Sequence, residues 1–380
     1  MTRPVRHSVA APSVQEIVSF LESLCPSLDS SAPPLSATSN LQVGAPTDLV
    51  EQIYVIPQPS YSLLTALPSH KSALLISAAP LFDTPPIAFD WKRPAHRLLL
   101  QLFEKQIAFY VLPPSYAAAP EGYDACLAEA IGFHEVLPLY IAGTAQQFKL
   151  VVFVPPPSVP DVHRAAAEAG AGTIGEYTYC SFQAPGKGTF LPSERANPAI
   201  GKRGQLEEVE EVRLEMVVPK HALLAVIEAV KEAHPYEEVA YDVYPLHNVG
   251  APCGRGCKVR LEKPMVFDDL LSTLEQALDL GTAYRLRYTP PDPQLANAGV
   301  THLAVGVGIG SCNDLLGAAQ EQKIEVIIVG GTSPSDWIGV PPPVLVDIGF
   351  LPAVAPGLKR LTDKLRQVFG GRGVKIDYAF

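Results

Sequence analysis

The clearest hydrophobic pattern lies near the middle of the chain, in the stretch LEEVEEVRLEMVVPKHALLAVIEAVKEAHPYEEVAYDVYPL. Apolar and polar residues alternate over Val212–Val218, and this period of two, with its β-branched residues, predicts a strand. The apolar residues of His221–Ala233 recur at helical spacing instead. His234 precedes a proline, which disfavours the helical conformation, so the helix should end there. Val239–Tyr244 alternates again, and the stretch therefore predicts a strand–helix–strand unit.

A second unit of the same kind precedes the first. Phe148–Val154 is apolar and rich in β-formers, which predicts a strand. Asp161 is suited to be the N-cap of a helix over Val162–Ala169, because its carboxylate can accept a bond from a free backbone N–H. The next strand is expected at Tyr177–Phe182. Together the two units predict one α+β domain of the ferredoxin-like type over Phe148–Leu246.

The flanking regions alternate between short buried strands and amphipathic helices, which is typical of α/β proteins. The expected strands are Gln52–Ile56, Ala73–Ser77, Ala108–Val111, Tyr284–Tyr288, His302–Gly306, Ile324–Val329, Val344–Ile348 and Val374–Tyr378. The expected helices are Ser13–Leu24, Tyr61–Leu67, Arg97–Lys105, Tyr123–Ile131, Phe267–Leu278, Asn313–Gln322 and Leu358–Val368.

Composition and charge narrow the function classes. The chain has 380 residues, of which 47% are hydrophobic and 18% charged, so a globular protein with a large core is expected. The net charge of −10 and the lack of a Lys/Arg cluster argue against nucleic acid as a direct ligand. No apolar run is long enough for a transmembrane helix, so no membrane association is expected.

The cysteines and the amino terminus bear on the compartment. Six cysteines do not form a disulfide framework, and the close pair Cys253 and Cys257 lacks partners at zinc-site spacing. A reducing, cytoplasmic location is therefore the default. Arg3 and Arg6 precede any acidic residue, which leaves a mitochondrial presequence as an alternative, and a nuclear location also stays open.

Two motifs could bind a ligand. The first is the polar turn His234, Tyr236, Glu237 and Glu238, which could hold a small ligand or a metal, or contact another subunit. The competing interpretation is a structural turn in which the proline ends the helix, the tyrosine packs and the acids face water. The second motif is a glycine-rich turn that includes Gly308, Gly310 and Ser311, which could bind an anion or simply allow close backbone packing.

Several long segments resemble the Nif-three (NGG-one-interacting factor three) family, which is also described as GTP cyclohydrolase I type 2-like. They are GAGTIGEYTYCSFQAPGKGTFLP, ANPAIGKRGQLEEVEEVRLEMVVPK and AHPYEEVAYDVYPL, with the word LQVG near the amino terminus. The resemblance implies an α/β fold: a two-part core, residues 1–147 and 249–380, interrupted by a CutA/PII-like insert at 148–248. It also implies two divalent metal ions and metal-dependent hydrolysis of a nucleotide or a related phosphorylated or purine substrate.

The resemblance also locates the positions of the metal ligands. The family words SHHPL, HTNLDAAPGG and GHxxTE align with SAAPL, PPSYAAAPEG and GFLPAV in this chain. The ligand positions are then occupied by Ala78, Ala79, Pro113, Ala117, Phe350 and Val354. None of these side chains has a lone pair to offer a cation. We therefore expect no metal cofactor and a pseudoenzyme that acts as a binding, scaffold or regulatory protein. The alternative is an active metal-dependent hydrolase that uses displaced ligands.

Other polar residues could replace the lost ligands, but each is expected at the surface or in a cap. They are Asp83, His96, Glu121, Asp124, Asp314, Asp336 and Asp347. Cys312 begins a predicted helix, where its thiolate could be favoured, but it has no partner motif, so we do not expect it to be catalytic. The family resemblance further implies a homo-oligomeric ring, commonly a hexamer, and leaves room for a protein partner.

Overall fold

The computed structural model describes residues 10–26, 40–67, 72–82, 88–90, 92–134, 136–191, 193, 202–248, 250, 252–280, 285–308, 312–337 and 343–379. The chain divides into two compact units. The core unit comprises Met1–Gly143 and Pro252–Phe380, and the insert unit comprises Thr144–Ala251, a few residues more at each end than the sequence suggested. Each unit is described by itself below.

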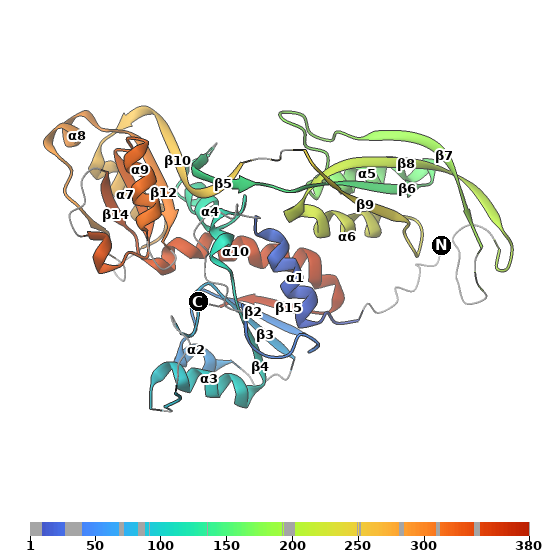
Figure 1. The fold of residues 1–380 in the computed structure, drawn as a ribbon, viewed down its shortest axis with the longest axis horizontal. Helices are drawn as coiled ribbons and strands as arrows, with labels where there is room; N and C mark the ends of the chain where they lie inside the picture. The colour runs from blue at the N-terminus through green and yellow to red at the C-terminus, as the bar shows by residue number, and fades with distance from the viewer. Residues whose placement is uncertain are drawn as a thin grey trace. The chain divides into compact units, whose positions relative to one another are not determined.

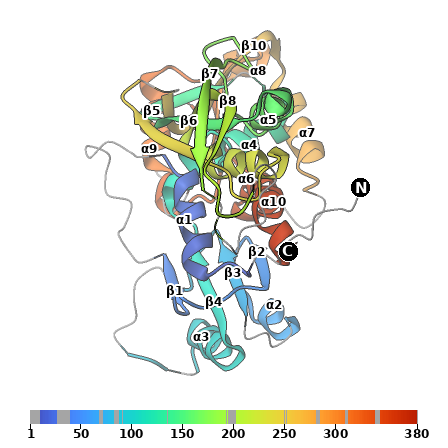
Figure 2. The same cartoon turned by 90° about the vertical axis from the view of Figure 1, so that its right-hand side faces the viewer.

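The core unit contains a five-stranded sheet whose central strands are completely buried. Its order is β1 (Leu41–Val43), β4 (Ile107–Val111), β3 (Ala73–Ser77), β2 (Gln52–Ile56) and β15 (Lys375–Tyr378). All neighbours are parallel except β1. A parallel sheet is normally covered on both faces, which explains the continuous apolar runs of β2, β3 and β4. Helices α2 (Tyr61–Ala66) and α3 (Pro94–Lys105) lie on one side of this sheet, away from α1 (Val14–Leu24) and α10 (Phe350–Phe369) (Figures 1 and 2).

A six-stranded mixed sheet forms the rest of the core unit. Its order is β11 (Arg287–Tyr288), β14 (Val344–Asp347), β13 (Val326–Gly330), β12 (Val300–Val307), β10 (Pro252–Met265) and β5 (Leu137–Thr144). Its helices are α4 (Tyr123–Ala130), α7 (Phe267–Ala277), α8 (Pro293–Ala298) and α9 (Asn313–Glu321). Strands β12, β13 and β14 are parallel, as their nearly uniform apolar sequences suggest. Helix α10 packs against strands of both sheets and joins them (Figure 1).

Two expectations for the core unit were wrong. The last helix was expected to begin at Leu358, but α10 begins at Phe350, directly after Gly349 in a left-handed backbone conformation (φ +82°). Pro356 lies inside the helix, where a proline is disfavoured because it has no backbone N–H to donate. Strands β5 and β10 were not predicted either. Both contain proline or several glycines, which lower the strand signal.

The insert unit has the strand–helix–strand repeat expected of a ferredoxin-like fold. Its antiparallel sheet has the order β7 (Phe182–Phe190), β8 (Glu207–Pro219), β6 (Gln147–Val154) and β9 (Tyr241–Leu246). Helices α5 (Val159–Glu168) and α6 (Leu223–Ala233) contribute to a core with buried residues of β6 and β8.

Two local expectations for the insert were wrong. The strand expected at Tyr177–Phe182 begins only at Phe182, because the chain first makes a tight turn at Gly175 (φ +56°) and enters the left-handed region again at Tyr179 (φ +56°). Asp161 is not an N-cap. It lies inside the first turn of α5, where its carboxylate accepts a hydrogen bond from Arg164 at 2.6 Å.

Candidate functional site

Three segments of the core unit carry the positions that the resemblance assigns to metal ligands. The first follows β3, where Ala78 is only 3% exposed and Ala79 is partly buried. The Ala78 N–H donates to the Ile56 carbonyl at 3.2 Å, and the Leu112 N–H donates to the Ser77 carbonyl at 2.8 Å. The Ser77 hydroxyl donates to the Ala79 carbonyl at 2.7 Å. Backbone groups at the carboxyl ends of neighbouring strands are thus already hydrogen-bonded. The two alanine side chains are methyl groups and offer no atom that could bind a metal.

The second segment is the short 3-10 helix η1 (Pro114–Ala118), which follows Pro113. Ala117 is 1% exposed. Its neighbour Tyr116 is also buried and packs edge-to-face on Tyr123, with 4.9 Å between the ring centroids. Burial raises the pKa of both tyrosine hydroxyls well above the usual value, so neither is available as a phenolate ligand. Ala117 is thus enclosed, in a segment where the neighbouring Tyr116 is also buried and packed.

The third segment is the beginning of α10. Phe350 and Val354 are four residues apart and so lie on one face of the helix. Val354 is completely buried, and Phe350 lies against the end of β13, where a Cβ added to Gly331 would be 3.3 Å from its ring. One turn further along, the Tyr116 hydroxyl donates a long bond to the Gly357 carbonyl at 3.5 Å. The structure thus places the second and third segments side by side.

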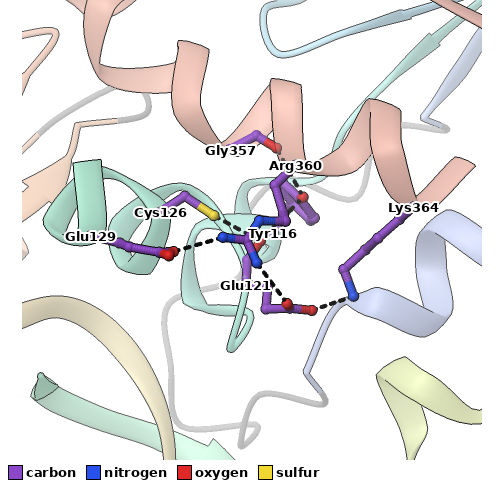
Figure 3. Close-up of polar contacts among 7 residues, drawn as sticks. All are labelled: Tyr116, Glu121, Cys126, Glu129, Gly357, Arg360 and Lys364. Carbon is purple, nitrogen blue, oxygen red and sulfur yellow. Dashed lines mark hydrogen bonds and ion pairs between the residues drawn. The ribbon is translucent and has the colours of Figure 1, made fainter. Parts of the chain in front are cut away.

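Charged residues link α10 to the chain that follows η1, including α4 (Figure 3). The Glu121 carboxylate pairs with Arg360 at 3.3 Å and with Lys364, and Arg360 also pairs with Glu129 at 2.8 Å. The Cys126 thiol donates to the Glu121 carbonyl at 3.4 Å, and burial raises the pKa of this thiol to about 12. Because the charged groups are partly exposed, we expect each pair to contribute about 0–1 kcal/mol. They fix the position of α4 on α10 more than they add stability.

A buried ion pair lies next to this site, and sequence reasoning missed it. Asp124, on α4, accepts hydrogen bonds from Arg255 Nε at 3.1 Å and from the backbone N–H groups of Gly256 and Val307, both at 2.7 Å. Arg255 also donates to the Val307 carbonyl at 2.6 Å. The two side chains are 2% and 9% exposed. Asp124 was expected at the surface or in a cap. It instead connects α4 to strands β10 and β12.

Two further carboxylates are buried at the carboxyl ends of β13 and β14. Asp336 is 2% exposed and accepts hydrogen bonds from the Ser333 N–H and hydroxyl at 2.6 and 2.8 Å. Asp347 is 6% exposed and accepts bonds from the Thr332 hydroxyl and the Gly349 N–H. Asp336 is a capping residue, as expected, but neither carboxylate lies at the surface. Both carboxylates therefore already accept hydrogen bonds from backbone N–H groups and side-chain hydroxyls.

The remaining polar candidates are separate from one another. His96 was expected at the surface or in a cap, but it is buried because its ring packs against Phe82 and Phe89, and its Nδ1 accepts a hydrogen bond from the Asp90 N–H at 2.7 Å. Asp314 is exposed, as expected. Asp83 lies outside the described residues. Cys312 is fully buried, and burial raises the pKa of its thiol to about 12, which removes the thiolate needed for catalysis.

Of the glycine-rich turn, the structure describes the residues up to Gly308. The Gly308 N–H donates to the Gly330 carbonyl at 2.8 Å, and a Cβ at Gly308 would be 2.9 Å from the Gly331 carbonyl oxygen. This residue is therefore needed for close backbone packing. Gly310 and Ser311 lie outside the described residues, so anion binding there stays a prediction.

The polar turn of the insert is held by one histidine. His234 is 7% exposed, and its Nδ1 accepts a bond from the Tyr236 N–H at 3.1 Å, so the other nitrogen, Nε2, carries the proton and donates to the Phe153 carbonyl at 3.1 Å. Burial lowers the pKa of His234. The Tyr236 ring packs edge-to-face on the imidazole, whereas Glu237 and Glu238 are exposed. Both imidazole nitrogens thus already have partners, Nδ1 within the turn and Nε2 in strand β6.

Across the part of the chain that the structure describes, no three or more His, Cys, Asp or Glu side chains are grouped so as to hold a metal ion.

A family profile described as Duf34/NIF3 (NGG1p interacting factor 3) matches residues 12–378. The chain belongs to the NIF3 family. Its curated relatives include proteins named "GTP cyclohydrolase 1 type 2 homolog". The one from Halalkalibacterium halodurans is 33% identical over 241 residues, which cover 61% of this chain and 65% of the relative. The one from Mycobacterium tuberculosis is 30% identical over 351 residues, 90% of each chain.

The solved structures agree with this assignment. A Bacillus cereus protein described as related to NIF3 has 29% identity and a TM-score of 0.61, with 97% of this chain and 96% of that chain covered. The matched stretch spans just under two thirds of the first relatives, 65% in Halalkalibacterium halodurans and 64% in Bacillus subtilis. The NIF3 fold expected from the sequence is thus confirmed. No sequence motif predicted the Asp124–Arg255 pair, because its two residues belong to separate halves of the core.

Proposed function

We propose that this NIF3-family protein does not use a di-metal centre and acts as a binding, scaffold or regulatory protein. One observation carries the proposal. All six positions that the resemblance assigns to metal ligands hold side chains without donor atoms, and Ala78, Ala117 and Val354 among them are at most 3% exposed.

Ligand chemistry supports this proposal. Divalent ions in proteins need several oxygen, nitrogen or sulfur donors at about 2.0–2.6 Å. Methyl, isopropyl, phenyl and pyrrolidine groups cannot supply them. The nearby carboxylates of Asp124, Asp336 and Asp347 are already bound to a guanidinium, backbone N–H groups or hydroxyls. The residues present therefore do not fit a di-metal site, and we derive no catalytic step through one.

The alternative is an active metal-dependent hydrolase of the GTP cyclohydrolase I type 2 kind. It is favoured by the name shared by the curated relatives. Such an enzyme would need displaced ligands, and Asp336 and Asp347, buried at the carboxyl edge of the parallel strands, would have to exchange their present donors for a cation.

A paired experiment separates the two functions. The protein and its Bacillus subtilis relative would be purified without chelator, supplied with zinc, iron and manganese, and assayed for GTP hydrolysis before and after EDTA. We expect no metal-stimulated turnover from this chain. Turnover that needs metal and disappears with EDTA would support the alternative.

We also propose that the protein forms a homo-oligomeric ring, with a hexamer as the expected size, and is located in the cytoplasm. The insert supports self-association, because its edge strand β7 is exposed along most of its length and Phe182 is 64% exposed. Multi-angle light scattering tests the assembly, and a monomer mass would refute it. No helix among the described residues is long and apolar enough to cross a membrane.

A further inference from the structure

An apolar stripe runs along the outer side of α3. Leu100 is 47% exposed and Phe103 is 60% exposed, and His96 lies four residues before Leu100. Spacings of three and four residues place these three side chains on one face of the helix. Phe89 packs on the His96 ring with 5.3 Å between centroids and is itself 65% exposed. We call Phe89, His96, Leu100 and Phe103 the α3 stripe.

The buried His96 ring supports the exposed part of the α3 stripe and is held in place by its neighbours. The His96 ring is 4% exposed and is held between Phe89 and Phe82, whose centroid is also 5.3 Å away. Its Nδ1 accepts a hydrogen bond from the Asp90 N–H at 2.7 Å. The exposed Phe89 ring therefore lies on a buried aromatic support, and little conformational entropy would be lost if a partner covered it.

The helix itself is anchored on its opposite side. Leu102 is fully buried, and Lys105 donates hydrogen bonds to the carbonyl groups of Leu64 and Leu67 at the end of α2. Gln101 donates to the Thr65 hydroxyl at 3.2 Å. The exposed apolar residues of α3 are thus presented by a rigid element, on the side of the five-stranded sheet away from α10 (Figures 1 and 2).

Positive charge gathers at the amino end of α3. Lys92, Arg93 and Arg97 are exposed there, and no acidic residue lies in the first turn of the helix. The exposed Asp90 carboxylate, which accepts a hydrogen bond from the Lys92 N–H at 2.9 Å, offsets part of this charge and leaves an excess of positive groups. The helix dipole adds to the positive potential at this end. Glu104 is the acidic residue at the other end. The whole chain carries a net charge of −10, so this basic group is a local exception that favours acidic side chains on whatever covers the stripe.

We propose that the α3 stripe binds an amphipathic helix of a partner protein whose apolar face covers Phe89, Leu100 and Phe103 and whose acidic residues meet Lys92 and Arg93. Amphipathic helices bind partner surfaces through apolar side chains at three- and four-residue spacing, which is also the spacing of the stripe. The charges fix the orientation of the partner helix and select against basic helices. This inference does not depend on whether the core unit uses a metal.

Fluorescence anisotropy tests the proposal with the full-length protein. The probe is a labelled synthetic helical peptide with leucines at helical spacing and glutamates on its other face, and its counterpart carries lysines instead. We expect the glutamate peptide to bind at least about tenfold more tightly than the lysine peptide, and Arg93→Glu to reverse this preference. The double variant Leu100→Ser, Phe103→Ser should weaken binding of the glutamate peptide at least about tenfold.

The control is Leu49→Ser, which changes a side chain that is 56% exposed outside the stripe and should leave binding unchanged. The proposal is overturned if the glutamate peptide shows no saturable binding, or if the double variant binds it as well as the unchanged protein. It is also overturned if light scattering shows that the double variant has a smaller assembly mass, because the stripe would then be covered by another copy of this chain.

Discussion

Replacing Asp124 with alanine tests how the core unit is held together. The substitution leaves the Arg255 guanidinium, 9% exposed, buried without its counter-charge. It also removes the acceptor of the Gly256 and Val307 N–H groups. Breaking a buried ion pair from one side costs about 3–5 kcal/mol, because the remaining charge is uncompensated. We therefore expect Asp124→Ala to lower the free energy of unfolding of the core unit by about 3–5 kcal/mol.

Urea denaturation followed by tryptophan fluorescence measures this loss. Both tryptophans, Trp91 and Trp337, belong to the core unit, so the signal reports that unit and not the insert. Arg360→Ala is the matched control, because its ion pairs are partly exposed and should contribute only about 0–1 kcal/mol each. A double variant in which apolar residues replace both Asp124 and Arg255 should recover part of the loss. A loss below about 1 kcal/mol for Asp124→Ala would refute the reasoning.

Three further predictions concern other parts of the chain. Gly122→Ala would place a Cβ 1.8 Å from a backbone oxygen and should lower the free energy of unfolding, measured by urea denaturation, by about 2–3 kcal/mol. Gly317→Ala is the matched control, because the space around it is open, and it should stabilise α9 by about 0.5–1 kcal/mol. His234 is neutral in the fold and its pKa is lowered from 6.5, so the unfolded chain gains the proton first and the insert should lose stability as pH falls below that value. Protection factors of the α6 amides, which compare the observed exchange with the intrinsic rate at each pH, should fall from pH 7 to pH 5, and equal protection factors would contradict this. Iodoacetamide at pH 8 should label the partly exposed Cys180 before the buried Cys126, whose thiol has a pKa of about 12. Mass spectrometry of the digested protein measures the order, and earlier labelling of Cys126 would contradict its burial.

Periodicity predicted the elements that bury a regular face. Gln52–Ile56 and Ala73–Ser77 are strands with the expected bounds, because every residue in them is buried in a parallel sheet. The beginning of α1 was also predictable, because Ser13 and Glu16 form a capping box. Periodicity failed where tertiary contacts override local preference. Helix α10 continues through Pro356, and β10 pairs with β12 despite its glycines.

The site could be predicted only in part. The alignment of family words identified the six positions, and the structure adds that Ala117 and Val354 are fully enclosed. The sequence could not show that Asp124 meets Arg255, because 131 residues separate them and neither has a local pattern. It also could not decide which turns are structural. The role of His234, at the end of α6, depends on the carbonyl of Phe153, which lies 81 residues away in strand β6.

Metal content per chain is the most direct test of the central claim. The protein would be purified without chelator, incubated with zinc, iron and manganese, passed over a desalting column and analysed by inductively coupled plasma mass spectrometry, with the Bacillus subtilis relative treated in parallel. The claim that the six positions no longer form a di-metal site predicts a metal-to-chain ratio near zero. A ratio of about one or two that survives desalting would contradict it, because donors other than those six side chains would then have to form a metal site.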